Sequence, residues 1–168
     1  MSRFLYLMRH GQSADKQPGQ ADKARELTVT GMRDATQIGK HLYDQKIIPK
    51  IILSSTAVRA KTTAQLVCEA LKVETEKIQL EEELYVASLS TFLALITQLD
   101  DSSNAVMCVG HNPAISYLAE YLTKVEIGDM PPAGLVIVQF NTLCWKDVKQ
   151  GVGELITFLT PENLRNEK

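Results

Sequence analysis

Cysteine is scarce in this chain of 168 residues, and its three copies lie far apart at Cys68, Cys108 and Cys144. No two of them form the closely spaced pair that a cysteine zinc site or a dithiol redox centre requires. An odd number of separated cysteines suits a reducing compartment better than a disulfide-stabilised secreted protein. We therefore expect Cys68 and Cys108, which lie in apolar stretches, to be buried packing residues.

Long apolar runs are also missing. The run from Phe4 to Met8 is interrupted by Arg9 and His10 before it could form the apolar core of a signal peptide. No stretch approaches the ~18 consecutive apolar residues of a membrane-spanning helix. We therefore expect a soluble, cytoplasmic protein.

Neither sign of charge is in clear excess, because 18 lysine and arginine residues face 20 aspartate and glutamate residues, for a net charge of −2 at pH 7. A general nucleic-acid binder or membrane-surface binder needs a net basic face, so the charge balance argues against both classes. It still permits a small local basic pocket. No acidic cluster of the kind that holds Mg²⁺ is evident, so we expect no metal site.

What the sequence does contain is a series of short apolar runs separated by helical patterns. Hydrophobic residues make up 45% of the chain, enough for a sizeable core in one domain of residues 1–168. Continuous apolar runs without strict alternation are typical of strands in a sheet that is covered on both faces. The runs that predict strands are Phe4–Met8, Ile51–Leu53, Ala105–Val109, Leu135–Phe140 and Leu155–Leu159.

Helical patterns fill most of the gaps between these runs. Strands that alternate with helices predict an α/β fold with a mostly parallel central sheet and helices on both faces. Of the two remaining gaps, Lys124–Gly134 predicts a loop, and Asn141–Gly153 predicts a hairpin or loop between the last two strands. The expected helices run from a cap at Thr30 to about Gln45, from Thr56 or Ala57 to about Leu71, from Ser88 or Ser90 through Leu99, and onward from Pro113.

Residues that can carry chemistry follow three of the predicted strands. The first strand ends in Arg9-His10-Gly11, Arg59 lies one turn into the helix after the second, and the third ends in Gly110-His111-Asn112. Because ligands of open parallel sheets bind beyond the carboxyl ends of the strands, we expect these side chains to meet at one edge of the sheet. The third histidine, His41, falls within a predicted helix and is expected to be a surface or core residue.

Two arginines and two histidines together suit a phosphoryl group. Arginine presents a planar fork of donors that matches phosphate oxygens, and the start of the helix after Pro113 adds backbone N–H groups. Gly11 permits a close approach of the backbone. One imidazole can act as a nucleophile while the other stabilises charge on the transferring group. Each segment alone also fits an ordinary turn or helix start, and it is their conjunction that favours a phosphate site.

The segments that carry these residues resemble motifs of the histidine phosphatase superfamily, which includes phosphoglycerate mutases and acid phosphatases. Leu7–Gly11 is similar to the family signature, Ser54–Ala64 to its second motif and Val109–Pro113 to its third. Leu27–Gly31 matches a segment found just before the first long helix of the family. The small size, the Gly-His-Asn-Pro form and the terminal Thr160–Leu164 segment resemble the SixA-like branch of phosphohistidine phosphatases.

The resemblance implies a phosphoglycerate-mutase-like fold and a role for each matching residue. His10 would be the nucleophile and would form a phosphohistidine intermediate, which water then hydrolyses. Arg9, Arg59 and His111 would hold the phosphoryl oxygens, and no metal or organic cofactor would be needed. The further substrate-binding residues that it implies are Gly11, Ser13 and Asn112.

The general acid is the point at which the sequence departs from the family. Many relatives use a carboxylate followed by glycines between the second helix and the third strand, and Glu81–Tyr85 falls in that region without the glycines. Glu83 is the candidate acid, and the alternative is a solvated acidic run before a helix. A weak acid favours cleavage of a P–N bond, because an alkoxide needs a proton on leaving and a protonated phosphoimidazole needs less help.

Three functions are consistent with these residues. The first is dephosphorylation of phosphohistidine on a partner protein, favoured because the short chain lacks inserted segments that could cover a small substrate. The second is hydrolysis of small phosphorylated metabolites such as sugar or nucleotide phosphates, which would make Glu83 essential. The third, a phosphate-binding module without turnover, is disfavoured because all four candidate catalytic residues are present. The sequence predicts no oligomeric state.

Overall fold

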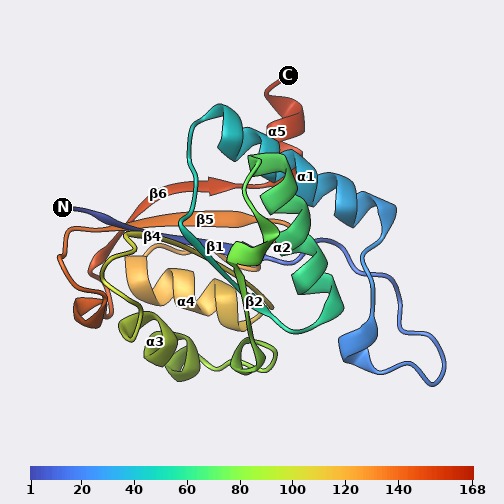
Figure 1. The fold of residues 1–168 in the computed structure, drawn as a ribbon, viewed down its shortest axis with the longest axis horizontal. Helices are drawn as coiled ribbons and strands as arrows, with labels where there is room; N and C mark the ends of the chain where they lie inside the picture. Colours follow the sequence, from blue (N-terminus) through green and yellow to red (C-terminus); the bar gives the residue numbers. More distant parts are fainter.

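The computed structural model describes all residues from Met1 to Lys168, and a six-stranded sheet runs through its centre (Figure 1). The strand order is β3-β2-β4-β1-β5-β6. Strands β1 to β4 are mutually parallel, β5 pairs antiparallel with β1, and β6 pairs antiparallel with β5. The predicted α/β class with a mostly parallel sheet is confirmed. The strands are β1 (Arg3–Arg9), β2 (Ile51–Ser55), β3 (Ile78–Glu81), β4 (Ala105–Gly110), β5 (Leu135–Phe140) and β6 (Gly153–Leu159).

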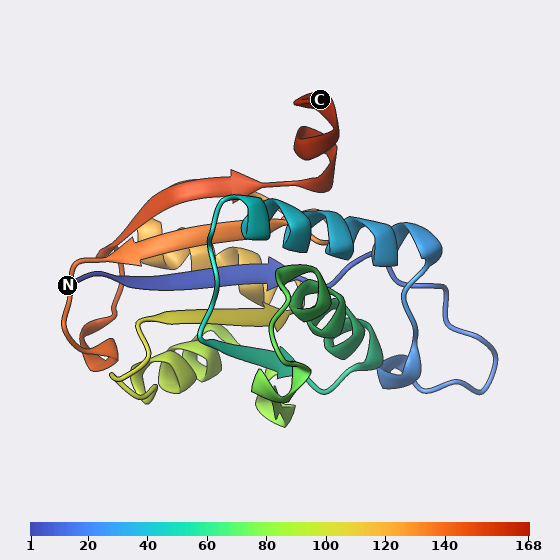
Figure 2. The same ribbon diagram turned by 45° about the horizontal axis from the view of Figure 1, so that its top comes forward.

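Helices cover both faces of this sheet, as the sequence predicted. The pair α1 and α2 pack together on one face, where α5 also lies, and α3 and α4 cover the other face (Figure 1, Figure 2). None of the helices combines the length and the apolar character needed to cross a bilayer. The helices are α1 (Val29–Asp44), α2 (Val58–Leu71), α3 (Leu89–Thr97), α4 (Ala114–Thr123) and α5 (Pro161–Asn166).

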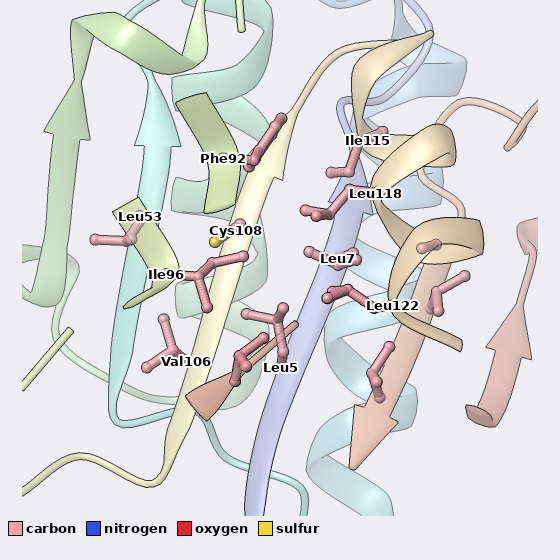
Figure 3. Close-up of a cluster of buried hydrophobic side chains, with 14 of the residues drawn as sticks. Leu5, Leu7, Leu53, Phe92, Ile96, Val106, Cys108, Ile115, Leu118 and Leu122 are labelled. Carbon is pink, nitrogen blue, oxygen red and sulfur yellow. The ribbon is translucent and has the colours of Figure 1, made fainter. Parts of the chain in front are cut away.

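Alternate side chains of the strands divide the core into two layers. On β1, Leu5 and Leu7 face the layer under α3 and α4, whereas Met8 faces the layer under α1 and α2. Figure 3 shows the first layer, in which Phe92 of α3 and Leu118 of α4 pack over the sheet. A central strand that is buried on both faces must be apolar along its whole length, which explains the continuous run at the start of the chain. The two cysteines expected to be buried, Cys68 and Cys108, lie one in each layer.

The first helix begins earlier than the sequence predicted. Its N-cap is Thr28 rather than Thr30, because Thr28 Oγ1 accepts a hydrogen bond from the Gly31 backbone N–H at 3.0 Å. Of the two caps considered for α3, the structure uses Ser88, whose hydroxyl accepts from the Thr91 N–H at 3.2 Å. The earlier start of α1 places Gly31 in its first turn, beside the candidate site.

The sequence missed the edge strand β3 and the short helix α5. β3 pairs only with β2, and its middle residues Gln79 and Leu80 are exposed, so it lacks the continuous apolar run of a covered strand. Four other strands extend further than predicted, β6 at its start and β1, β2 and β4 at their ends. Arg9, Ser55 and Gly110 are therefore the last residues of β1, β2 and β4 rather than residues that follow them.

The connections on either side of β5 are loops, as predicted. No helix or strand is present between Lys124 and Gly134. The connection from β5 to β6 contains one short 3-10 turn, Trp145–Asp147, in which Trp145 is fully buried. The Trp145 Nε1–H donates to the Ser103 carbonyl oxygen at 2.7 Å, so this ring anchors the end of the sheet opposite the candidate site.

Candidate active site

The predicted phosphate-binding residues meet beyond the carboxyl ends of β1, β2 and β4, whose arrowheads lie at the same end of the sheet in Figure 2. A pocket of about 320 Å³ opens there. The candidate catalytic residues Arg9, His10, Arg59 and His111 line this one pocket, together with two of the candidate substrate-binding residues, Ser13 and Asn112. Its lining comprises Arg9, His10, Ser13, Asp22, Arg25, Arg59, Tyr85, Val86, His111 and Asn112.

His10 follows β1 directly and is buried. Its Nδ1 lies 2.7 Å from the carbonyl oxygen of Gly11. Because a carbonyl oxygen only accepts hydrogen bonds, Nδ1 carries the proton and Nε2 keeps its lone pair. Burial, reinforced by the positive charges of Arg59 and Arg9, lowers the pKa of His10 to about 4. At neutral pH this ring is therefore uncharged and has a nitrogen able to attack phosphorus.

His111 follows β4, and its ring centroid lies 5.0 Å from that of His10. Its Nε2 lies 2.8 Å from Ser55 Oγ, whereas its Nδ1 is buried without a hydrogen-bond partner. Ser55 Oγ accepts from the Ala57 N–H at 3.2 Å and still has its own proton to donate to His111 Nε2. When the Ser55 hydroxyl donates in this way, His111 Nδ1 carries the ring proton and is an N–H donor without a partner. Burial lowers the pKa of His111 to about 3.

Two arginines are held by the protein on one side and keep N–H groups free on the other. Arg9 Nη1 donates to the Met130 carbonyl oxygen at 2.9 Å, and Arg9 Nε is buried without a partner. The Arg59 side chain, 9% exposed, donates from Nη1 to the Asp22 carbonyl oxygen at 2.9 Å and from Nη2 to the Asp22 carboxylate at 3.1 Å. A guanidinium has five N–H groups, so each arginine retains donors for an anion.

Sequence reasoning missed four residues of the pocket wall, the apolar Val86 and the polar residues Asp22, Arg25 and Tyr85. The Asp22 carboxylate accepts from the Tyr85 hydroxyl at 2.6 Å and from Arg25 Nη1 at 3.1 Å, in addition to Arg59. The hydrogen bond from Tyr85, followed by those from the two arginines, holds the pKa of Asp22 well below its usual range. The same hydrogen bond to Asp22 raises the pKa of Tyr85. The carboxyl group is therefore ionised, and the phenol keeps its proton.

The three polar residues lie in segments without any periodic pattern. Asp22 and Arg25 belong to the long loop between β1 and α1, and Tyr85 follows the short turn after β3. The one usable signal was the position of Arg25 just before the Leu27–Gly31 segment that matches the family. Arg25 also donates from Nη2 to Ser13 Oγ at 2.9 Å, which occupies one acceptor site of this candidate substrate-binding hydroxyl.

Glu83, the candidate general acid, lies outside the pocket. It is exposed in the 3-10 turn Glu82–Leu84 and lines a separate surface hollow with Ser90 and Thr91 of α3. The structure places no carboxylate other than Asp22 in the pocket wall. The alternative interpretation of this acidic run, as a solvated segment before a helix, fits its position.

Two of the predicted substrate-binding residues, Gly11 and Asn112, make their hydrogen bonds to other groups of the protein. The Gly11 N–H donates to Thr63 Oγ1 at 2.9 Å, and a Cβ at this position would lie 2.7 Å from the Gly31 carbonyl oxygen. The close approach that Gly11 permits is therefore that of the first turn of α1. The Asn112 amide, although it lines the pocket, donates to a main-chain carbonyl and accepts from the Ser116 hydroxyl at 2.6 Å.

The pocket can bind and transfer a phosphoryl group. It combines a neutral imidazole that has a free Nε2 with arginine donors and a second imidazole, and these groups match a nucleophile beside a set of phosphate oxygens. No group of three or more His, Cys, Asp or Glu side chains is placed to hold a metal ion. His41 lies in α1, outside the pocket.

Comparison with known proteins links this site to one family. A family model described as histidine phosphatase superfamily (branch 1) matches residues 5–85. An uncharacterized protein of Mycobacterium tuberculosis is 30% identical over 164 residues, which cover 92% of this chain and 99% of the relative. A mitochondrial serine/threonine-protein phosphatase Pgam5 of Drosophila ananassae is 32% identical over 77 residues, which cover 46% of this chain and 26% of that protein.

Solved structures show the same fold over nearly the whole chain. A candidate phosphohistidine phosphatase SixA from Agrobacterium tumefaciens has a TM-score of 0.81 at 30% identity, and the match covers 95% of this chain and 98% of that one. A protein histidine phosphatase SixA complexed with tungstate has a TM-score of 0.82 at 23% identity, with coverage of 96% and 99%. The phosphoglycerate-mutase-like fold implied by the sequence motifs is confirmed. This chain belongs to the histidine phosphatase superfamily.

Proposed function

We propose that this protein removes the phosphoryl group from phosphohistidine on a partner protein, through a phosphoenzyme formed on His10. The observation that carries the proposal is that the one carboxylate in the pocket, that of Asp22, is ionised. Asp22 accepts hydrogen bonds from Arg25, Arg59 and Tyr85, stays ionised and therefore has no proton to give to a leaving group. The Tyr85 hydroxyl, the nearest alternative acid, is committed to Asp22.

The two candidate substrate classes differ in what their leaving groups need. An oxygen ester leaves as an alkoxide, which requires a proton from a general acid. A phosphohistidine ring takes up its proton before the P–N bond breaks and then leaves as a neutral imidazole. A pocket with many donors for phosphoryl oxygens and no proton donor for a leaving group therefore favours the P–N bond.

The pocket residues divide the reaction into two displacements. His10 Nε2 attacks phosphorus, the P–N bond of the substrate breaks, and its electron pair passes to the departing ring nitrogen. The Gly11 carbonyl oxygen keeps its hydrogen bond to His10 Nδ1–H while positive charge develops on the His10 ring. Arg9, Arg59 and His111 Nδ1–H bind the phosphoryl oxygens during the transfer. Water then attacks phosphorus, the bond to Nε2 breaks, and inorganic phosphate leaves, with no step that requires a metal ion or an organic cofactor.

A phosphorylated protein as substrate is supported by the nature of the relatives and by the site itself. The structure from Agrobacterium tumefaciens is described as a candidate phosphohistidine phosphatase and shares 30% identity with this chain. The pocket wall includes the loop from β1 to α1, in which no residue from Asp15 to Glu26 is buried. A histidine on a protein surface can approach a site with such an open rim.

A paired phosphate-release assay tests this proposal. One arm uses a phosphohistidine peptide or protein, the other a panel of sugar phosphates, nucleotide phosphates and p-nitrophenyl phosphate, and His10→Ala is the control in both. We expect kcat/KM to favour phosphohistidine by at least about tenfold, a free-energy difference of about 1.4 kcal/mol. A preference for the esters would identify a small-molecule phosphatase instead, and no turnover in either arm would indicate a binding module.

A further inference from the structure

The Asp22 carboxylate is an anion inside a pocket that must receive an anion. Arg9, Arg25 and Arg59 supply the positive charge of the pocket wall, and Asp22 offsets part of it. A phosphoryl group brought beside this carboxylate experiences like-charge repulsion, which is strengthened where water is partly excluded. The carboxylate thus weakens the binding of any phosphate, unless another part of the ligand interacts favourably with its negative charge.

The position of this carboxylate is fixed by its neighbours. Oδ2 accepts from Arg59 Nη2 at 3.1 Å and from the Tyr85 hydroxyl at 2.6 Å, and Oδ1 accepts from Arg25 Nη1 at 3.1 Å. An ionised carboxylate has about four acceptor sites, so these three hydrogen bonds leave about one site open. The Asp22 side chain is 44% exposed and lines the pocket, so a ligand in the pocket can reach this carboxylate.

We propose that Asp22 is the specificity-determining residue of this pocket. The open acceptor site of its carboxylate accepts a hydrogen bond from the ring N–H of a cationic imidazole, and it thereby selects phosphoryl groups that are bound to such a ring. This inference rests on the proposed function. The ring takes its proton from water before the transfer, and a carboxylate beside it favours this protonated form, in which the P–N bond breaks readily. When that bond breaks, its electron pair passes to the ring nitrogen and the ring leaves neutral, so Asp22 neither gains nor loses a proton. A phenolate or alkoxide has no N–H to donate and is repelled.

A purely positioning role for Asp22 has a different signature. Asp22 orients Arg59 through both its carboxylate and its carbonyl oxygen, and it holds Tyr85, whose ring stands edge-on to His111 at a centroid distance of 5.7 Å. Loss of that support would slow every substrate alike. Loss of a contact to the imidazole N–H would slow phosphohistidine alone.

The experiment therefore compares kcat/KM for a phosphohistidine peptide and for p-nitrophenyl phosphate in the wild type, Asp22→Asn and Asp15→Asn. Asparagine keeps the size of Asp22 and a carbonyl acceptor for its donors, but removes the charge. Asp15 is exposed on the same loop and its side chain makes no hydrogen bond, so Asp15→Asn removes an equal charge outside the pocket. Circular dichroism establishes that each variant is folded, and Asp22→Ser supplies a second neutral variant.

We expect Asp22→Asn to lower the ratio of phosphohistidine to ester kcat/KM by about tenfold, the size of one lost hydrogen bond to a charged group. Inorganic phosphate should also inhibit Asp22→Asn at lower concentration, and Asp15→Asn should keep the wild-type ratio. An unchanged ratio in Asp22→Asn and Asp22→Ser, or equal losses for both substrates, would overturn the specificity role while the proposed function stands. A wild type without phosphohistidine activity would overturn both.

Discussion

The imidazole rings of His10 and His111 lie 5.0 Å apart, from centroid to centroid, with their planes tilted by 55°. They follow β1 and β4, two neighbouring parallel strands that pair up to their last residues. Each ring is held at one nitrogen, His10 by the Gly11 carbonyl oxygen and His111 by the Ser55 hydroxyl. The register of the sheet therefore sets the distance between the proposed nucleophile and the imidazole opposite it.

Removal of the nucleophile is the most direct test of this arrangement. His10→Ala should lower kcat by at least about 10³-fold, because it removes the nitrogen on which the covalent intermediate is proposed to form. Brief incubation with labelled phosphohistidine should produce an acid-labile phosphoenzyme in the wild type and none in His10→Ala. His41→Ala, a histidine change in α1 outside the pocket, should retain full activity and labelling. A labelled His10→Ala protein would place the nucleophile elsewhere.

The low pKa of His10 predicts an unusual acid limb in the rate profile. Because burial lowers this pKa to about 4, Nε2 keeps its lone pair across the range in which a free histidine, with a pKa of about 6.5, would be protonated. After correction for ionisation of the substrate, kcat/KM should stay level down to about pH 5 and fall as pH drops through about 4. An acid limb at about pH 6.5 would contradict the assignment.

The same shift affects stability, with a sign that follows from proton binding. Between about pH 6.5 and about pH 4 the unfolded chain protonates His10 and His111 while the folded chain leaves both neutral. The free energy of unfolding should therefore decrease as pH falls through this window. Urea denaturation at a series of pH values measures the effect, and His10→Ala should show a shallower decrease than the wild type.

Adjacent buried serines in β2 offer a matched pair for testing how His111 is oriented. Ser55→Ala removes the hydrogen-bond partner of His111 Nε2 and should lower kcat about tenfold, the size of effect typical of groups that fix a catalytic ring. Ser54→Ala removes only a contact between the Ser54 hydroxyl and the Ser55 carbonyl oxygen, and should change kcat less than about twofold. Equal effects of the two substitutions on kcat would argue for a general loss of packing in β2.

Glu83 offers a test of the general acid. Since its side chain is exposed outside the pocket, Glu83→Gln should change kcat/KM for phosphohistidine by less than about twofold, within the small effect of most surface substitutions. Tyr85→Phe, which removes a donor to Asp22 inside the pocket, should have the larger effect. The measurement is kcat/KM of both variants for an ester and for phosphohistidine. A selective loss of ester turnover in Glu83→Gln would instead identify Glu83 as the general acid.

Gly11 should tolerate no side chain. A Cβ at this position would lie 2.7 Å from the Gly31 carbonyl oxygen, so Gly11→Ala should cost about 1–3 kcal/mol of stability and displace the loop that carries His10. Gly19→Ala is the control, because its Cβ would meet no atom within 4 Å and its φ of +77° carries only a backbone cost of about 1 kcal/mol. Urea unfolding and kcat should both decline in Gly11→Ala, whereas Gly19→Ala should keep its kcat.

The central strands and four pocket residues were predictable because strong local patterns mark them. β1 and β4 are buried on both faces, so their sequences are continuous apolar runs, and the residues that follow them had to reach the ligand edge of a parallel sheet. β3 escaped prediction because it is an edge strand with exposed middle residues. Thr28 and Thr30 are equally good caps by residue type, and only the contact with Gly31 distinguishes them.

The rest of the pocket wall could not be predicted, for a physical reason. Asp22 and Tyr85 meet through a hydrogen bond between two irregular segments that are far apart in the chain, and no periodicity links them. The role considered for Glu83 depended on the family resemblance, which fixed a region of the chain and not the direction of its side chains. In this chain it is Asp22, from the loop between β1 and α1, that supplies a carboxylate to the pocket wall.

The loop between β1 and α1 has a consequence for how inactivation proceeds. No residue from Asp15 to Glu26 is buried, and Asp22, Lys23 and Arg25 attach this loop to its neighbours mainly through polar contacts, such as the ion pair of Lys23 with Glu82. Segments with few buried apolar contacts detach at a small free-energy cost, whereas β1 lies between two paired strands and opens only with global unfolding. Enzymatic activity would then be lost at a lower denaturant concentration than secondary structure. The half-life of activity would accordingly report how readily this loop detaches, and not how readily the whole fold unfolds.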